Sequence, residues 1–296
     1  GGGPCTLLFA SCLDDREFWV PLVEKAYAKL HGTYANLEGG LISHGLRDLT
    51  GEATEVINLK SPTSPYVKNN YAGLWDFLLK AMKEGFLMGC AGHCPAPDMK
   101  RDVVLPNGDV MMSNGLMYDH AYGILDVQEV FTSNPFHGTK QKHCLVRLRN
   151  PWGKGEWNGR WGDGAKEWTP ELIERFGVSF GNDGTFFMCL EDFTANFDII
   201  HVLRLLTDDI GEKWDKFLFR GEWGIAKEGG GKMRAGGCQN YADTYLDNPQ
   251  FCIRTTQPTL VLVYLAQPCQ RYAARKRERE EGNKRKKRML QVQGRG

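Results

Sequence analysis

The hydrophobic pattern of this 296-residue chain changes its period once, and this change limits the possible folds more than any other feature. In residues 14–32, apolar side chains recur every three or four positions, which is typical of an amphipathic helix. Asp14 or Asp15 is suited to cap its start, and Gly32 to end it. The apolar stripe comprises Phe18, Trp19, Leu22, Val23, Ala26 and Leu30. A second helix is predicted over residues 70–85.

After Gly85 the pattern changes to short runs of apolar and β-branched residues separated by Gly, Pro and Asn, which predict strands. Such runs occupy residues 86–94, 120–131 and 142–153, and again 217–223, 251–256 and 259–267. Helices followed by strands favour an α+β protein. Because single cores stop growing at roughly 250 to 300 residues, we expect two domains, the second being a separate β domain that begins near Trp214.

Charge divides the chain more sharply than its net value of +1 indicates. From residue 270 onward there are 11 Lys or Arg and 3 Glu, whereas residues 1–269 hold 26 basic and 33 acidic side chains. A strongly basic tail cannot bury apolar surface, so we expect a solvated helix or a disordered extension. An anionic membrane surface is its candidate partner, while the sequence gives no strong sign of nucleic-acid binding.

Nine cysteines are scattered along the chain without the regular spacing of a disulfide framework. The sequence also shows no signal peptide and no run of about 18 apolar residues, so we expect reduced thiols and a cytoplasmic protein. Cys90, His93 and Cys94 lie close together. A zinc site needs a second pair of ligands, however, and packing is the simpler interpretation.

Two polar residues stand at the ends of predicted strands. His120 begins the run HAYGILDV, and Asn150 ends the run LVRLRN, where Pro151 prevents the strand from continuing. A histidine held by an Asn side-chain carbonyl has a fixed tautomer and orientation, as a general base for a thiol or hydroxyl requires. Trp152 would cover this hydrogen bond from water. A core histidine and an unrelated turn asparagine are the alternative.

Several segments closely resemble the calpain family of calcium-dependent cysteine proteases. They are EFWVPLVEKAYAKLHGTYANLEGG, DLTGEATEVI, DHAYGILDV and LVRLRNPWGKGEWNGRWGD, followed by DGTFFMCLEDF and GEWGIAKEGGGKMRAGGCQNYADTYLDNPQFCI. The resemblance covers about residues 7–267. It implies a papain-like core of two lobes, in which one lobe supplies a nucleophilic Cys and the other supplies His120 as the base and Asn150 as its orienter.

The resemblance also implies how an α+β chain of this kind is divided. Residues 1–51 would be the remnant of a helical first lobe, and residues 52–206 a barrel-like antiparallel second lobe that carries His120 and Asn150. Residues 207–269 would form an incomplete C2-like β-sandwich. Residues 270–296 would be the basic tail.

Cys5 follows a run of glycines and precedes a short apolar stretch, which is typical of an activated thiol at a helix start, so it is a candidate nucleophile. In the family, the nucleophile lies in a segment resembling Q-G-x-L-G-D-C-W, several dozen residues before the tryptophan that corresponds to Trp19. Cys5 lies only 14 residues before Trp19, and Thr6 rather than Trp follows it. The resemblance thus argues against Cys5, and we expect the chain to begin inside the first lobe. It would be either a fragment of an active protease or a natural form that cannot cleave.

Calcium is the cofactor that the resemblance implies, with one site in each lobe built from carboxylates and backbone carbonyls. Glu17 would be the surviving ligand of the first-lobe site. In the second lobe Glu156, Asp163 and Asp183 match the family's ligands. Thr185 stands where many members carry an acid, so we expect weak binding. Solvated loop acids are the alternative.

The function implied by the resemblance is that of a calcium-dependent cysteine endopeptidase, which carries out limited proteolysis of protein substrates in the cytoplasm. A non-catalytic pseudoprotease or binding module is the first alternative, because the nucleophile is not assigned. An adaptor that binds an anionic membrane surface or nucleic acid through residues 270–296 is the second.

Overall fold

The computed structural model describes residues 9–12, 14, 16–68, 71–92, 102–105, 109–117, 119–133, 140–206, 214–224 and 234–267. Two compact units are distinguished within the chain, one of which contains Gly1–Leu205 and the other Leu206–Ala266. None of the helices in these described ranges is long and apolar enough to cross a membrane. The region boundaries expected at residues 51, 206 and 269 stay predictions.

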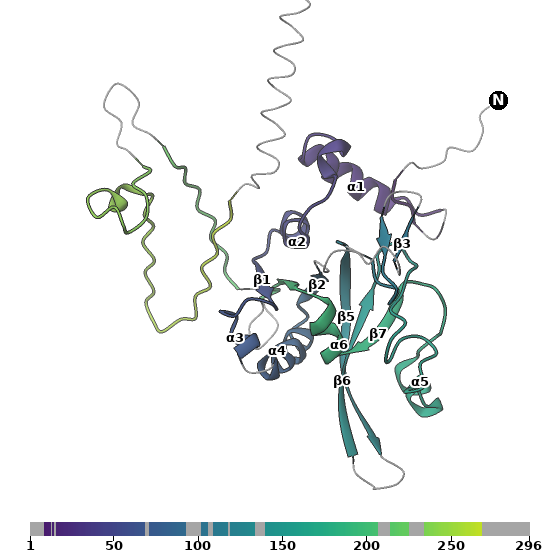
Figure 1. The fold of residues 1–296 in the computed structure, drawn as a ribbon. Helices are drawn as coiled ribbons and strands as arrows, with labels where there is room; N and C mark the ends of the chain where they lie inside the picture. The colour runs from purple at the N-terminus through teal and green to yellow at the C-terminus, as the bar shows by residue number, and fades with distance from the viewer. Residues whose placement is uncertain are drawn as a thin grey trace, which may run out of the picture. The chain divides into compact units, whose positions relative to one another are not determined.

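The first unit begins with a helical segment, coloured purple in Figure 1. It contains α1 (Trp19–Leu30), the 3-10 helix η1 (Tyr34–Leu37) and α2 (Ile42–Thr50). The helix expected within residues 14–32 is thus confirmed. Its expected cap is wrong, because Phe18 holds the N-cap position and the Asp14 carboxylate binds Arg16 instead.

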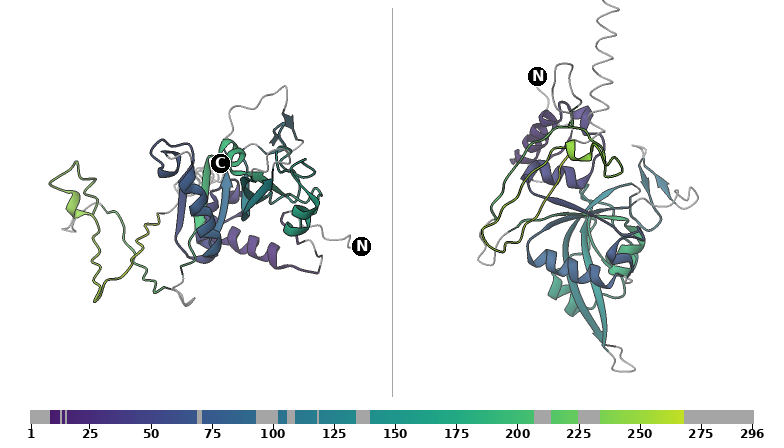
Figure 2. Two further views of the ribbon diagram at one scale, coloured as in Figure 1. Left: turned by 90° about the horizontal axis from the view of Figure 1, so that it is seen from below. Right: turned by 90° about the vertical axis from the view of Figure 1, so that its left-hand side faces the viewer.

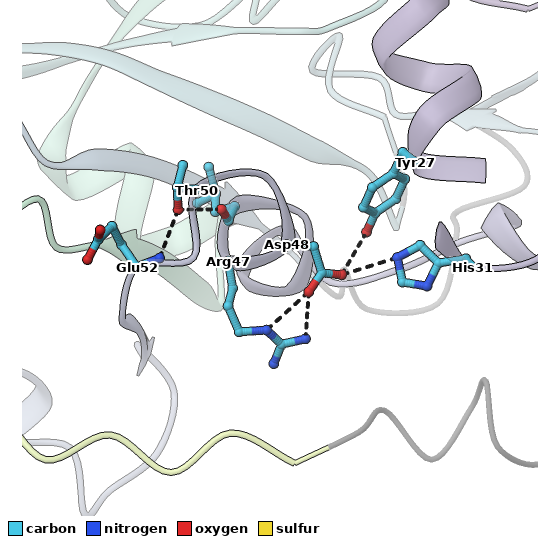
Figure 3. Close-up of polar contacts among 7 residues, drawn as sticks. Tyr27, His31, Arg47, Asp48, Thr50 and Glu52 are labelled. Atoms are coloured by element: carbon cyan, nitrogen blue, oxygen red, sulfur yellow. Dashed lines mark hydrogen bonds and ion pairs between the residues drawn. The ribbon is translucent and has the colours of Figure 1, made fainter. Parts of the chain in front are cut away.

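Asp48 of α2 ties the two helices together (Figure 3). Its Oδ2 atom lies 3.1 Å from His31 Nε2 and accepts a hydrogen bond of 3.5 Å from the Tyr27 hydroxyl. Its Oδ1 atom accepts from the Arg47 guanidinium at 3.0 Å. The Asp48 side chain is only 14% exposed, so these contacts are shielded from water and stabilise the helix pair more than surface ion pairs would.

The apolar stripe of α1 faces solvent within the described structure. Phe18, Trp19 and Leu22 are 59%, 62% and 63% exposed, and Ala28 is the buried residue of the helix. The stripe therefore predicted the helix but not its burial. Amphipathicity states that a helix has an apolar face, and does not say which element covers that face.

Six strands form one antiparallel sheet (Figures 1 and 2). In spatial order they are β1 (Thr54–Asn58), β8 (Ile199–Leu203), β2 (Leu87–Ala91), β5 (Ala121–Ser133), β6 (Lys140–Arg149) and β7 (Thr185–Cys189). A separate two-stranded ribbon pairs β3 (Val103–Val104) with β4 (Val110–Met111).

The α+β class is confirmed, whereas the barrel-like form expected for this region needs correction. Among the described residues no pairing joins β1 to β7, so the sheet is open. A sheet closes only when its two outermost strands can hydrogen-bond to each other. Here β1 and β7 are the two edges, with four strands between them.

One face of the sheet carries the main core. Ile57, Cys90 and Ile200 lie on this face and are at most 4% exposed. It is covered by α4 (Ala72–Lys83), which follows the short α3 (Pro65–Lys68), and by α6 (Leu190–Asn196). Tyr122 of β5 packs edge-on against Phe197 at the end of α6. The second expected helix, within residues 70–85, is confirmed as α4.

The opposite face is covered in two places. Near β2, a Cβ added to Gly89 would lie 3.1 Å from the Ile42 side chain of α2, so glycine permits the close approach of helix and sheet. Near β6 and β7, Trp161 and Trp168 form a second buried cluster with Phe187. Partly buried residues of α5 (Pro170–Phe176) pack against this cluster.

The described residues of the second unit are residue 206, residues 214–224 and residues 234–266. They contain no strand. Their one regular element is the 3-10 helix η2 (Tyr245–Asp247). The strands expected at 217–223, 251–256 and 259–267 are not formed in these described residues, while the incomplete sandwich expected over residues 207–269 stays a prediction. Many of these apolar side chains are exposed, Leu260 and Leu265 by 77% each. A strand needs a neighbour to satisfy its backbone groups and cover its apolar face.

Candidate active site

Three neighbouring strands bring the candidate residues to one end of the sheet. Gly123 of β5 pairs with Arg149 of β6, and Arg149 pairs with Thr185 of β7. Because the strands are antiparallel, the start of β5, the end of β6 and the start of β7 lie side by side. His120 comes directly before β5, and Asn150 directly after β6.

His120 and Asn150 are hydrogen-bonded, with His120 Nε2 2.9 Å from Asn150 Oδ1. An amide oxygen only accepts, so Nε2 carries the imidazole proton and Nδ1 is free to take another. Asn150 is fully buried, and its Nδ2 donates to the Gly155 carbonyl at 3.2 Å. The two residues therefore meet as expected from the sequence, while their catalytic roles stay predictions.

Trp152 flanks this pair. The centres of its ring and of the His120 ring are 4.4 Å apart, and its backbone N–H donates to Asn150 Oδ1 at 3.1 Å. The Trp152 side chain is itself 40% exposed. It therefore shields one side of His120, and Tyr122 packs edge-on against the imidazole at 5.1 Å.

Burial lowers the pKa of His120 below its ordinary value, because the protonated ring is harder to hold away from water. The hydrogen bond with Asn150 and the charge of Asp109 oppose this shift. The imidazole is therefore neutral near pH 7, with its proton on Nε2. This is the state that a general base requires.

The three acids expected to bind metal surround one loop. Glu156 Oε1, Asp163 Oδ2 and Asp183 Oδ1 accept backbone N–H groups of residues 181–185, at 2.7, 3.0 and 2.7 Å. Burial raises the pKa of Glu156, and the charges of Asp163 and Asp183 raise it further against a hydrogen bond from Gly184. Burial also raises the pKa of Asp163, with the charge of Asp183 adding to the shift. The three carboxylates thus repel one another.

The oxygen donors around this loop suit a calcium ion chemically. Their side chains are not arranged around a common point that could hold the ion. Oxygen donors and mutual repulsion between carboxylates favour a hard divalent cation. However, no group of three or more His, Cys, Asp or Glu in the described part of the chain is arranged to hold a metal ion. Glu17, the other expected ligand, lies before α1 and accepts a hydrogen bond from Trp19 Nε1 at 3.2 Å.

The described cysteines provide no thiol bonded to His120. Burial raises the pKa of Cys90 well above its ordinary value and that of Cys189 to about 12, so both are poor nucleophiles. Cys12 is half-buried. Cys5, His93 and Cys94 lie outside the described residues, and with them the candidate nucleophile and the zinc alternative.

Two residues near the pair were missed by the sequence analysis. Gly155 accepts the hydrogen bond from Asn150 Nδ2, and Asn182 Oδ1 accepts a hydrogen bond from the Gly155 N–H at 2.9 Å. Nothing in one sequence relates residue 182 to residue 155, because only the pairing of β6 with β7 brings the two loops together.

Comparison with protein families gives two matches. A family model described as calpain family cysteine protease matches residues 3–204. A second, described as domain III of the calpain large subunit, matches residues 219–292.

Individual relatives agree with these matches. Calpain clp-1 of Caenorhabditis elegans is 35% identical over 261 residues, which cover 84% of this chain and 30% of that protein. Calpain-8 of Homo sapiens is 37% identical over 255 residues, covering 84% and 32%. Calpain-B of Drosophila melanogaster is 34% identical over 264 residues, covering 85% and 26%. The chain thus spans about a third or less of the length of these relatives.

Proposed function

Because the chain belongs to the calpain family of cysteine proteases, we propose that His120 and Asn150 are the base and orienter of a cysteine endopeptidase. The observation that carries this proposal is the 2.9 Å hydrogen bond between them at adjoining strand ends. This bond leaves His120 Nδ1 unprotonated, and the buried Asn150 amide fixes the orientation of the imidazole ring.

The reaction follows from this protonation state. His120 Nδ1 takes the proton of a cysteine thiol, and the thiolate forms a bond to the carbonyl carbon of a peptide substrate. The C–N bond then breaks as His120 returns the proton to the leaving amine, which produces a thioester. Water, deprotonated by the same histidine, hydrolyses the thioester and restores the thiol.

Variants of the histidines test the proposal in a fluorogenic peptide assay, in whichever form of the protein shows turnover, the 296-residue chain or a longer natural form that contains it. His120→Ala should reduce kcat/KM by roughly 10³-fold or more, and Asn150→Ala by less, because losing the base is worse than loosening it. His143→Ala is the matched control, since His143 bonds Thr132 along the same hairpin. Equal turnover by His120→Ala and wild type would refute the assignment.

A non-catalytic binding role is the second candidate, favoured by the lack of a described thiol bonded to His120. A peptide epoxide that alkylates activated thiols separates the two candidates. Labelling of one cysteine that depends on His120 identifies the nucleophile, and Cys5→Ser and Cys12→Ser examine the two cysteines before α1. Peptide binding with no labelling and no turnover in any natural form would favour the binding role.

Calcium dependence is a further part of the proposal, supported by the repulsion among Glu156, Asp163 and Asp183. Binding requires these carboxylates to exchange backbone N–H partners for the cation. With three carboxylates and Thr185 in place of a fourth, we expect a dissociation constant of roughly 10⁻⁴ M. Calcium should then raise the melting temperature by mass action, and Mg²⁺ should do so less.

Isothermal titration calorimetry measures this binding directly. Asp163→Asn should remove it, whereas Glu174→Gln, which changes an exposed acid of α5, should not. Equal calcium binding by Asp163→Asn and wild type, or none by wild type at millimolar metal, would show that these acids are only a solvated loop.

Location and partners complete the proposal. The cysteines in the described residues form no disulfide, which supports a cytoplasmic protein that acts on other proteins. Residues 270–296, which lie outside the described residues, supply a basic segment for an anionic membrane surface. Vesicle co-sedimentation with and without this segment tests the membrane contact, which should weaken with salt and vanish on deletion.

A further inference from the structure

The Asn150 side chain must be held in one of two amide orientations. Its Oδ1 atom faces both His120 Nε2 and the Trp152 N–H, while its Nδ2 atom donates to the Gly155 carbonyl. A reversed amide would set its NH₂ group against the Trp152 N–H and its oxygen against the Gly155 carbonyl. The Trp152 N–H and the Gly155 carbonyl therefore both select the orientation that His120 needs.

Gly155 is itself held in place by a side chain. Its φ of 80° lies in the left-handed region, and a Cβ at this position would lie 3.3 Å from Asn150 Nδ2. Glycine permits this conformation but does not enforce it. Asn182 Oδ1 accepts the Gly155 N–H at 2.9 Å and so holds the peptide unit between Lys154 and Gly155. The Gly155 carbonyl belongs to the next peptide unit, which this bond positions through the shared Gly155 Cα.

The segment before β7 thus reaches Asn150 by two routes. The Gly184 carbonyl accepts the backbone N–H of Asn150 at 2.7 Å, and this contact needs no particular side chain. The route through Gly155 depends on the side chain at position 182. Only this second route acts on the orientation of the Asn150 amide.

We propose that Asn182 is a positioning residue for His120. It acts through three successive hydrogen bonds, from the Gly155 N–H to Asn182, from Asn150 Nδ2 to the Gly155 carbonyl, and from His120 Nε2 to Asn150 Oδ1. Its effect is to keep the proton of neutral His120 on Nε2. The inference rests on the proposed function in that His120 is taken as the base.

The test reads the histidine directly and needs no turnover. The chain is labelled with ¹⁵N-histidine and studied by NMR with a chelator present, and the His120 signals are identified by their loss in His120→Gln. In wild type, the shifts should report the Nε2–H tautomer with slow exchange of that proton. Asn182→Ala should speed this exchange by roughly 2- to 10-fold, as expected for loss of an ordinary hydrogen bond, and should populate the Nδ1–H tautomer.

Two further variants separate positioning from a general structural effect. Asn182→Asp keeps the acceptor oxygen and should restore the wild-type signals. Asn158→Ala removes a comparable exposed amide, which donates to the Ser113 carbonyl at 3.0 Å, and should leave His120 unchanged. If Asn182→Ala does not fold, Asn182→Ser gives the same reading, because its hydroxyl is too short to replace the bond.

The outcomes distinguish the two levels of the argument. Wild-type tautomer and exchange in both Asn182→Ala and Asn182→Ser would overturn the role of Asn182 and leave the proposed function standing. Failure of Asn182→Asp to restore the signals would also overturn it. A wild-type His120 without an Nε2–H tautomer would contradict the His120–Asn150 pair itself, and with it the proposed function.

Discussion

Helices α1 and α4 are each twelve residues long, and both carry apolar side chains at helical spacing. The two helices nevertheless differ in how far these side chains are buried. In α4, Leu74 and Leu78 are fully buried, whereas in α1 Leu22 and Leu30 are 63% and 65% exposed. The difference lies in what surrounds each helix. The sheet covers α4, and no described residue covers the apolar stripe of α1.

This difference shows where the fold derives its stability and where the site lies. Burial of apolar area is the main favourable contribution to folding, so the sheet and α4 contribute most of it. His120 and Asn150 stand at one end of β5, β6 and β7. Of these strands, β5 and β6 lie inside the sheet and β7 forms its edge. We expect the geometry of His120 and Asn150 to depend on the sheet core far more than on α1.

The largest expected effect is a loss of stability from a substitution in the buried helix α4. Leu78→Ala should lower the free energy of unfolding by about 2–5 kcal/mol, because it leaves a cavity in the core. Leu22→Ala, the matched change in α1, should alter it by less than about 0.5 kcal/mol. Urea unfolding followed by tryptophan fluorescence measures both. A loss of similar size in Leu22→Ala would mean that α1 is covered in solution.

An intermediate effect is expected at the contact between α1 and α2. Asp48→Asn removes the charge that His31, Arg47 and Tyr27 share, and should destabilise the helix pair by about 1–3 kcal/mol. Hydrogen exchange of the α1 and α2 amides measures this locally. Asp14→Asn is the control, because its carboxylate bonds only the exposed Arg16 among described partners. Unchanged protection in Asp48→Asn would contradict the tether.

The smallest expected effect concerns pH at the junction between α2 and the sheet. Burial lowers the pKa of His201 on β8 and of His44 on α2 from 6.5. The charge of His44 lowers the pKa of His201 further, and that of Arg47 lowers the pKa of His44. The folded state then binds protons less readily than the unfolded chain, so stability is complete above pH 6.5 and falls as pH drops below it. Burial of His120 adds to the same trend.

Unfolding free energies measured between pH 7.5 and 5 check this sign. His201→Gln should make the free energy of unfolding decline less steeply as pH falls, because glutamine does not titrate in this range. In wild type, protonating His201 would place a charge on its buried Nδ1 atom, which has no hydrogen-bond partner among the described residues. His143→Gln, at a histidine bonded to Thr132, is the control. A decline of the same slope in His201→Gln and wild type would refute the assignment.

Several features of the fold and site followed from local sequence. The helical periods gave α1 and α4, and the runs at 120–131 and 142–153 gave β5 and β6. The placement of His120 and Asn150 also followed, because both stand at the limits of strands. Period and chain-breaking residues depend on neighbours a few positions apart, so they can be read along one chain.

Tertiary structure alone decided the rest. The order of strands set β7 beside β6, and only this brought Asn182 to Gly155 and the 181–185 loop to Glu156. The apolar stripe of α1 is also exposed in the tertiary structure. The strands expected at 217–223, 251–256 and 259–267 are not formed in the described residues. The physical reason is the same in each case. An apolar face or an unpaired backbone group specifies that it needs a partner, while the partner itself comes from residues far away in sequence, which local pattern cannot identify.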